Sequence, residues 1–420
     1  MATLAAPPQL TQRPEHVRAD LVYDFDMYHD QALVEDMPAR ILDLARNAPP
    51  IFWTPHNGGH WVICRHAEVF EAARNWQDFS SDHIGHDRGL LDSGRPMPDM
   101  SEVLMPVPIL LDPPMHSKFR APLNTVLSPR AMLALQGHVR ELARALIAQV
   151  RQDGACEFMA AIAEPIPVQI FLEMFGLPLE RQDEFRKLVH DHLSESPGDH
   201  EASQRQLFRM AAVMNDTLLD RRDNPRDDLI SALWQTQVDG RPLTLRDMEN
   251  YCVLLFIAGL DTVMNGMGLG IAYLAADPQL QDELRANPAL IVEAAEELLR
   301  RFTFLTVVRT IGRDTVFRGI AMREGDRAML CYPAAGVDEN EYPAPQAFDL
   351  HRENKAHFAF GAGPHRCVGS HLARIELQVV YEEMLAGLPP FRLDPEKPVR
   401  YRCGPVIGPH EVHLLWDAPR

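Results

Sequence analysis

Apolar residues recur every three or four positions over most of this chain, which is the spacing that buries one face of a helix. Alternating apolar and aromatic runs are short; they lie at 51–64, 310–330 and 391–416, beside glycine turns. The pattern therefore predicts a mainly α protein with a few small hairpins. The predicted helices cover residues 37–47, 66–76, 129–151, 165–175, 179–193, 201–222 and 370–388, with two more between 277 and 302.

The longest apolar run covers residues 251–275 and is long enough to cross a membrane. Asp261, Thr262 and Asn265 lie in its middle, and a capping pattern at 244–247 precedes it. Because ionisable side chains are rarely buried without a partner or a function, we interpret the run as a helix inside the protein rather than a membrane span.

Domain boundaries are not evident in the sequence. Residues 1–30 are polar and proline-bearing, and we expect an irregular arm there. Residues 31–420 contain no linker, repeat or low-complexity tract, although length alone would allow two or three domains. We therefore expect a single domain over 31–420, in which residues 80–110 form a long loop.

Composition excludes some classes of function. The chain has 41 basic and 59 acidic residues, a net charge of −18, which argues against a nucleic-acid partner. Its six cysteines are scattered without the spacing of a disulfide framework, and residues 1–10 contain no apolar run of a signal peptide or anchor. We expect a cytoplasmic protein with reduced thiols and no membrane contact.

Residues 358–374 hold the most distinctive chemistry. Two glycines and a proline lead to Cys367, which precedes the last predicted helix. A thiolate at a helix N-terminus is stabilised by the helix dipole, and it is a ligand for soft or redox-active metals. The residues alone leave two other interpretations, a cysteine that simply packs in the core and a zinc site, although the spacing lacks the paired ligands of usual zinc sites. The zinc ligands would be His357, His365, Cys367 and His371.

The pattern Phe360-x-x-Gly363-x-x-x-Cys367-x-Gly369 resembles the haem-binding signature of the cytochrome P450 family. The resemblance extends over nearly the whole chain and is strongest to the soluble bacterial group that hydroxylates camphor. It implies the mainly α P450 fold with small β-sheets, in which haem b lies between a long central helix and the helix after the cysteine. The Cys367 thiolate would then bind the haem iron.

A second motif, Ala258-Gly259-Leu260-Asp261-Thr262, lies inside the long apolar run. A threonine inside a helix can bond back to the carbonyl four residues earlier and open the helix to water. By itself the group is equally consistent with a bent helix that has no chemistry. It resembles the oxygen-activation motif of P450s, which implies that Thr262 hydrogen-bonds dioxygen and that Asp261 relays protons.

Charged residues match the family at further positions. Glu297 and Arg300 would form an ordinary surface pair in an arbitrary helix; with Arg352 they resemble the buried ion cluster of P450s, which implies a structural role. Haem carries two propionates, which need cationic or histidine donors. The resemblance assigns this role to His116, Arg120, Arg309 and His365.

Departures from the camphor-hydroxylating pattern indicate another substrate. Leu104 stands where that group has a tyrosine, Val307 stands where it has an aspartate, and the loop before Asp112 is longer. The matched pocket positions are nearly all aliphatic, so they either fill the core or line a pocket for a small apolar substrate, such as a terpenoid or norisoprenoid ketone. These positions are Leu104, Ile109, Leu254, Ile257, Ala258, Leu305, Val307 and Val406.

The resemblance implies a monooxygenase that inserts one atom of O2 into a C–H bond. A separate 2Fe-2S ferredoxin and its reductase would supply electrons, because the sequence has no Gly-x-Gly-x-x-Gly segment for NAD or flavin. Two alternatives stay open: a peroxide-driven peroxygenase, which can dispense with the proton relay, and a haem-binding sensor or carrier without turnover. A basic docking face for an acidic ferredoxin would comprise Lys118, Arg120, Arg366 and Arg374.

Overall fold

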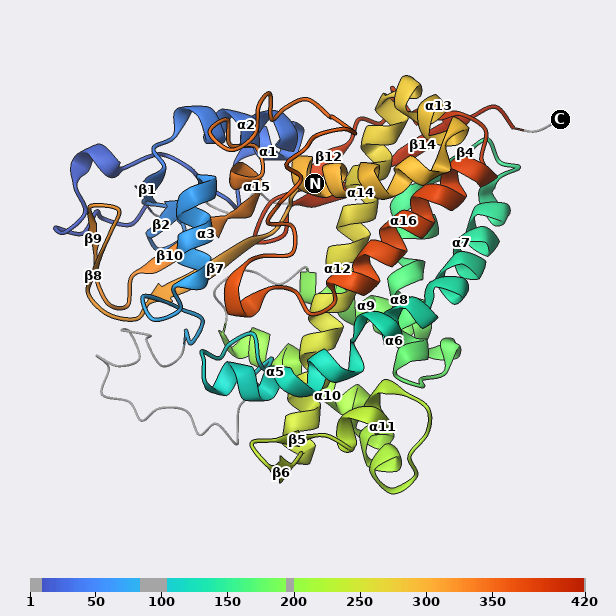
Figure 1. Ribbon diagram of the computed structural model, residues 1–420, viewed down its shortest axis with the longest axis horizontal. Helices are drawn as coiled ribbons and strands as arrows, with labels where there is room; N and C mark the ends of the chain where they lie inside the picture. The colour runs from blue at the N-terminus through green and yellow to red at the C-terminus, as the bar shows by residue number, and fades with distance from the viewer. Residues whose placement is uncertain (1–9, 84–103, 194–199, 419–420) are drawn as a thin grey trace. The chain divides into compact units, whose positions relative to one another are not determined.

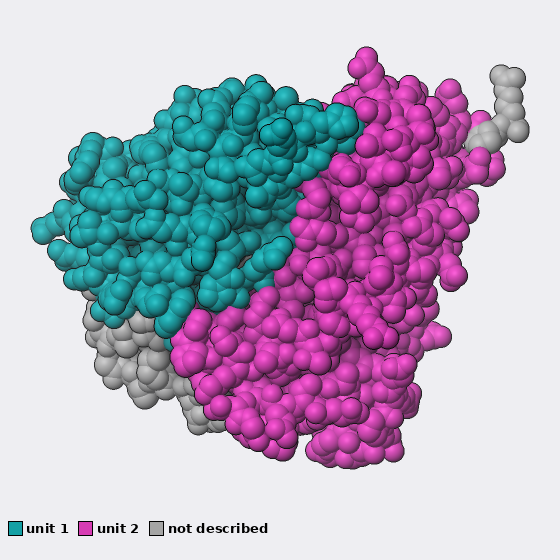
Figure 2. Space-filling model, viewed as in Figure 1, with its two compact units in different colours: residues 1–95, 297–366, 400–408 teal, residues 96–296, 367–399, 409–420 magenta. Residues whose placement is uncertain are grey.

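The computed structural model of the chain describes residues 10–83, 104–193 and 200–418 (Figure 1). Contacts between Cα atoms divide the chain into two compact units (Figure 2). Residues 1–9 of the predicted arm and residues 84–103 of the predicted long loop lie outside the described residues. Unit 1 comprises residues 1–95, 297–366 and 400–408, and unit 2 comprises residues 96–296, 367–399 and 409–420.

Unit 1 is built on a five-stranded sheet of order β1-β2-β10-β7-β3, in which β2 and β10 are parallel and the other pairs are antiparallel. The predicted hairpin at 51–64 is confirmed as β1 and β2. Its turn contains Asn57, Gly58 and Gly59, all with positive φ (55°, 84° and 75°), which explains the two glycines. The strands are β1 (Ile51–Thr54), β2 (His60–Ile63), β3 (Phe79–Ser80), β7 (Thr306–Ile311), β8 (Thr315–Phe317), β9 (Ile320–Met322), β10 (Arg327–Cys331) and β12 (Arg400–Arg402).

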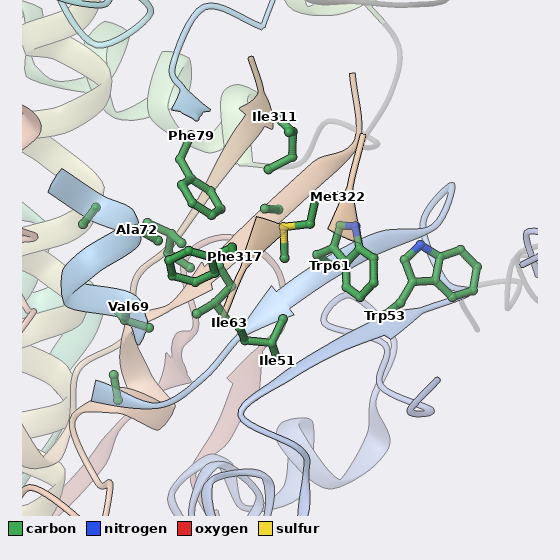
Figure 3. Close-up of a cluster of buried hydrophobic side chains, with 14 of the residues drawn as sticks. Ile51, Trp53, Trp61, Ile63, Val69, Ala72, Phe79, Ile311, Phe317 and Met322 are labelled. Carbon is green, nitrogen blue, oxygen red and sulfur yellow. The ribbon is translucent and has the colours of Figure 1, made fainter. Parts of the chain in front are cut away.

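A hydrophobic core lies on one face of this sheet. Figure 3 shows Trp61, Ile63 and Phe79 from the sheet gathered with Phe317 and Met322 of the β8–β9 hairpin. Helix α3 covers them with Val69 and Ala72, so this face of the sheet is closed by a helix. The described helices of unit 1 are α1 (Gln31–Glu35), α2 (Met37–Asn47), α3 (His66–Arg74) and α15 (Tyr332–Ala335), with the short turns η1 (Ala19–Leu21) and η5 (Gly363–His365).

Unit 2 is mainly helical. Its described helices are α5 (Met115–Val126), α6 (Pro129–Ala134), α7 (Gln136–Val150), η2 (Met159–Ala163), α8 (Pro165–Met174), η3 (Leu179–Arg181), α9 (Gln182–Leu193), α10 (His200–Asp223), α11 (Leu229–Trp234), α12 (Leu245–Ala276), α13 (Pro278–Ala286), η4 (Pro288–Leu290) and α16 (Ser370–Gly387). Its strands are β4 (Ala155–Glu157), β5 (Gln237–Val238), β6 (Arg241–Pro242), β11 (Phe391–Leu393) and β14 (His413–Trp416). Among the described elements, α14 (Ile291–Arg301) and β13 (Gly408–Glu411) have residues in both units. The prediction of a mainly α protein with small sheets is confirmed.

Most predicted helices keep their bounds to within two residues. The one predicted over 179–193 starts with the 3-10 turn η3 and continues as α9, and the one predicted over 129–151 is divided into α6 and α7. The division falls at Leu135, whose N–H bonds to the carbonyl of Met132 at 3.0 Å, three residues back. This tighter turn interrupts the regular ladder, in which each N–H bonds to the carbonyl four residues earlier.

Helix α12 is the long apolar run, and it starts at the predicted cap. The Thr244 hydroxyl accepts from the backbone N–H of Asp247 at 3.2 Å, and the Asp247 carboxylate accepts from the N–H of Thr244 at 2.8 Å. Within the described residues α12 is the one helix that could cross a membrane by length and composition. However, 72% of the most apolar 18-residue stretch of α12 is buried inside the protein, which agrees with its interpretation as a core helix.

Helices α12 and α16 lie against each other in unit 2. The hydroxyl of Tyr381 on α16 donates to the carbonyl of Gly266 on α12 at 3.1 Å. Gly270, one turn further along α12, has no room for a side chain, because a Cβ there would stand 2.0 Å from the same hydroxyl oxygen. The contact therefore fixes α16, the helix that follows Cys367, relative to the helix with the polar motif.

Candidate active site

The segment before Cys367 is shaped by two glycines. Gly361 and Gly363 have φ of +66° and +69°, a conformation that costs other residues free energy. At Gly363 a Cβ would also stand 2.3 Å from the carbonyl oxygen of Ala73 on α3, so the backbone passes too close to α3 for any side chain. Replacing Gly363 would force this part of the loop out of place.

Cys367 lies two residues before Gly369, the N-cap of α16. This places its thiol at the N-terminal end of an 18-residue helix, whose dipole and unpaired N–H groups favour the thiolate. The predicted relation between cysteine and helix is therefore present in the structure.

Cys367 differs from the other five cysteines, all of which are described. Its side chain is exposed, whereas the others are buried or half-buried. Burial raises the pKa of Cys156 and Cys331 to about 12 and that of Cys403 to about 11, and it raises the pKa of the remaining two as well. Those five are thiols at neutral pH, so Cys367 is the cysteine best placed to bind a metal.

The polar motif of α12 is arranged around two side chains. The Thr262 hydroxyl donates to the carbonyl of Ala258 at 2.8 Å, which is the predicted bond to the carbonyl four residues back. The Asn265 side-chain amide donates to the backbone oxygen and to a carboxylate oxygen of Asp261, both at 2.8 Å. Asn265 thus holds the Asp261 carboxylate in one orientation, and this role was not predicted from the sequence.

The same turn of α12 opens onto space. Ala258 and Gly259 are exposed although most of the helix is buried, and a Cβ built at Gly259 would meet no atom within 4 Å. At Gly369, beside the cysteine, a Cβ would meet only the Cys367 sulfur, at 3.9 Å. An exposed thiol, an exposed helix backbone and apolar neighbours fit a flat apolar cofactor whose metal binds sulfur, which are properties of haem.

The four candidates for propionate binding are divided between the units. In unit 2, His116 and Arg120 lie one turn apart on α5, and the Tyr251 hydroxyl of α12 donates to the Phe119 carbonyl of α5 at 2.7 Å. In unit 1, Arg309 lies on β7, where it pairs with Ala328 of β10. His365 Nε2 is 3.0 Å from the Ser81 hydroxyl just after β3.

The pocket candidates are also divided. Unit 2 holds Leu104, Ile109, Leu254, Ile257 and Ala258; Leu104 is fully buried, whereas Ile109 is 47% exposed. Unit 1 holds the other three. There Leu305 and Val406 face each other in an isolated β-bridge, and Val307 packs against the core of Figure 3.

Glu297, Arg300 and Arg352 form one buried cluster in unit 1. Both oxygens of the Glu297 carboxylate accept from Arg300 at 2.8 Å, and one also accepts from Arg352 Nε at 3.0 Å. The remaining guanidinium N–H groups donate to backbone carbonyls of residues 336–347. The cluster thus holds an irregular segment that precedes the cysteine in the chain.

Comparison with known proteins decides the family. The sequence profile described as Cytochrome P450 matches residues 172–398. A protein of Sinorhizobium fredii named "Probable cytochrome P450 127A1" is 33% identical over 96% of each chain. The chain belongs to the cytochrome P450 family.

Further relatives agree with this assignment. Linalool 8-monooxygenase of Pseudomonas putida is 27% identical over 93% of this chain and 98% of its own. The crystal structure of CYP101J2 matches with a TM-score of 0.86 at 34% identity and covers 97% of this chain and 100% of that one. The predicted P450 fold and an oxidoreductase of the monooxygenase kind are therefore confirmed, and the family implies haem with a cysteine thiolate ligand.

Proposed function

We propose that this P450 hydroxylates a small apolar compound, of the size of a terpenoid or norisoprenoid, with O2 and electrons from a 2Fe-2S ferredoxin. The observation that carries the proposal lies within unit 2. There the exposed Cys367 lies just before α16, which is bonded to α12, and α12 carries the Asp261–Thr262 pair beside open space.

The residues have distinct roles in this proposal. Bound haem supplies the oxidising chemistry, and the Cys367 thiolate is its ligand. The Thr262 hydroxyl and the Asp261 carboxylate deliver the protons that the reaction of O2 requires. Asn265 holds the Asp261 carboxylate in position for this role. Propionate binding by His116, Arg120, Arg309 and His365 orients the cofactor, while the Glu297 cluster holds the segment before the cysteine.

The substrate class rests on the pocket candidates and on a relative. The candidates are aliphatic in both units, and such walls position a ligand by shape more than by polar contacts. Linalool, which appears in the name of one relative, is a terpenoid alcohol of the proposed size. A small apolar substrate fits both observations.

The ferredoxin would dock on a basic face, and the protein would work in the cytoplasm. Lys118 and Arg374, which belong to this face, are already ion-paired. Lys118 Nζ is 2.8 Å from Asp239, and Arg374 contacts Glu296 through two N–H groups at 2.6 and 2.9 Å. An acidic partner would have to compete with these carboxylates, so we expect a weak and salt-sensitive complex.

Reconstitution tests the function against its two alternatives. The holoprotein is given a panel of apolar compounds, either with ferredoxin, reductase and NADH or with hydrogen peroxide alone. Product that requires the electron chain supports the monooxygenase. Product with peroxide alone indicates the peroxygenase, and no product across the panel, despite tight binding, indicates a carrier or sensor.

A further inference from the structure

We propose that Gln204 of α10 latches the backbone at Leu104 in place, and that this latch controls how fast apolar ligands enter and leave the site. The inference rests on the proposed function, because it concerns the wall of the proposed substrate pocket. It assigns a role to two residues, Gln204 and Asn250, that belong to no motif in the sequence.

The latch is a pair of hydrogen bonds between one side chain and one residue's backbone. Gln204 Oε1 accepts from the N–H of Leu104 at 3.2 Å, and Gln204 Nε2 donates to the carbonyl of Leu104 at 3.1 Å. The amide thus satisfies both backbone groups of a residue that has no regular secondary structure. A side chain with only a donor or only an acceptor could not do this.

The next residue is held by α12. Asn250 Oδ1 accepts from the N–H of Met105 at 2.9 Å, and both Met105 and Asn250 are buried. Residues 104–105 therefore connect α10 to α12 through side-chain amides. If the segment is to move away from α12, the bonds to both helices must break.

Asn250 also shows which side of α12 the segment covers. Leu254, Ile257 and Asp261 lie four, seven and eleven residues after Asn250, a spacing that keeps all four on one face of the helix. This face bears two pocket candidates and the proposed proton relay. Segment 104–105 therefore lies at the start of this stripe, and Leu104, itself a pocket candidate, is fully buried.

The two anchors differ in strength of attachment. Asn250 belongs to a buried stretch of a 32-residue helix, whereas Gln204 is half-buried near the start of α10. A hydrogen bond that water can replace contributes less than one that is fully buried. Release of the segment should therefore begin at Gln204, which makes this residue the control point.

The test uses the full-length holoprotein and two readouts. The first is amide hydrogen exchange at Leu104 and Met105, which needs no activity. The second is stopped-flow measurement of 1-phenylimidazole binding, an apolar ligand whose nitrogen coordinates haem iron. Gln204→Leu removes both bonds; Gln204→Glu keeps the acceptor but places a carboxylate against the Leu104 carbonyl.

Gln206→Leu is the matched control, since Gln206 lies on the same helix and donates to the Leu188 carbonyl at 3.3 Å, away from the latch. In Gln204→Leu we expect exchange at Leu104 to rise about tenfold, and both 1-phenylimidazole rates to rise about threefold or more. In Gln204→Glu, the exchange rate at Leu104 and the 1-phenylimidazole rates should fall between those of Gln204→Leu and those of the wild type. In Gln206→Leu, both readouts should match the wild type.

Unchanged exchange at Leu104 in Gln204→Leu, or an equal rise in Gln206→Leu, would overturn the latch. Raised exchange with unchanged ligand rates would overturn its control of access. If the wild type takes up no haem or binds no 1-phenylimidazole, the proposed function itself fails, and the exchange data then report only whether the bonds hold the segment.

Discussion

Two buried carboxylates, Glu297 in unit 1 and Asp261 in unit 2, are held in contrasting ways. Glu297 is fully buried and bonded to two guanidinium groups, which are themselves fixed by backbone carbonyls. Asp261 is bonded to the neutral amide of Asn265, on a helix whose neighbouring turn is exposed. The first arrangement fixes a charge and a loop; the second orients a carboxylate beside space that a substrate or water can reach.

The contrast shows that burial and partners, more than residue type, decide what a carboxylate does. Two arginines and the backbone carbonyls around them hold Glu297 in a closed cluster, which suits a structural role. The proposed relay role of Asp261 rests instead on its place next to an exposed turn of α12. The family resemblance gave Glu297 a structural role and Asp261 a relay role, and the structure adds the partners that hold each carboxylate.

The largest effect is expected when the Glu297 cluster is broken. Glu297→Gln leaves two buried guanidinium groups with too little negative charge, so we expect a loss of about 3–5 kcal/mol in the free energy of unfolding in urea. Glu293→Gln, at an exposed position of the same helix, should change it by less than about 0.5 kcal/mol. Equal losses in the two variants would contradict the structural role.

A third carboxyl group, that of Glu376, extends the comparison, because burial is the cause of its shifted pKa. Burial raises the pKa of Glu376 on α16 from its ordinary 4.5 to about 8. The folded protein then keeps a proton that the unfolded chain releases, so stability falls as pH rises from about 4.5 to about 8. Glu376→Gln should remove this loss, which is at most about 1.4 kcal/mol per pH unit.

Urea unfolding of the wild type and Glu376→Gln at several values of pH checks this prediction. The two curves of stability against pH should diverge steadily as pH rises towards 8, with the variant more stable. Parallel curves would mean that Glu376 ionises as easily in the folded protein as in the unfolded chain.

The proton relay is expected to affect chemistry without affecting stability. Thr262→Ala should lower product formed per NADH consumed by about tenfold, because electrons are still used when proton delivery is misdirected. Thr125→Ala is the control, since Thr125 makes the same bond to the carbonyl four residues back, at 3.2 Å, on the exposed side of α5. Unchanged coupling in Thr262→Ala would remove the proposed role of this hydroxyl.

The smallest effect concerns the docking face. Arg374→Gln should raise the KM for ferredoxin about two- to fivefold at low salt, leave kcat unchanged at saturating ferredoxin, and lose its effect at high salt. Arg144 on α7 forms a different ion pair, with Glu383 on α16. Arg144→Gln breaks that pair and should leave the KM for ferredoxin unchanged. A similar change in both variants would indicate a general loosening of α16.

Local patterns were enough to predict much of the fold. The helix at 37–47, the cap of α12 and the hairpin of β1 and β2 follow from spacing, capping residues and glycine turns, which act within a few residues. The cysteine segment and the Asp261–Thr262 motif were found because their residues are contiguous. The division at Leu135 was missed, since a single tighter turn leaves the apolar spacing intact.

Long-range partners could not be predicted in the same way. Gln204 and Asn250 are ordinary polar residues of helices, and only the fold brings them to Leu104 and Met105. The pairing of Lys118 with Asp239 likewise joins residues far apart in the chain. Division into two units also depends on contacts between distant segments, which local spacing does not encode.

The central claim is that the Cys367 thiolate binds haem iron, and the absorption spectrum of the reduced protein under carbon monoxide tests it most directly. We predict the long-wavelength Soret band from which the family takes its name in the wild type, and its loss in Cys367→Ala. A wild type without this band, or a Cys367→Ala variant that keeps it, would contradict the account.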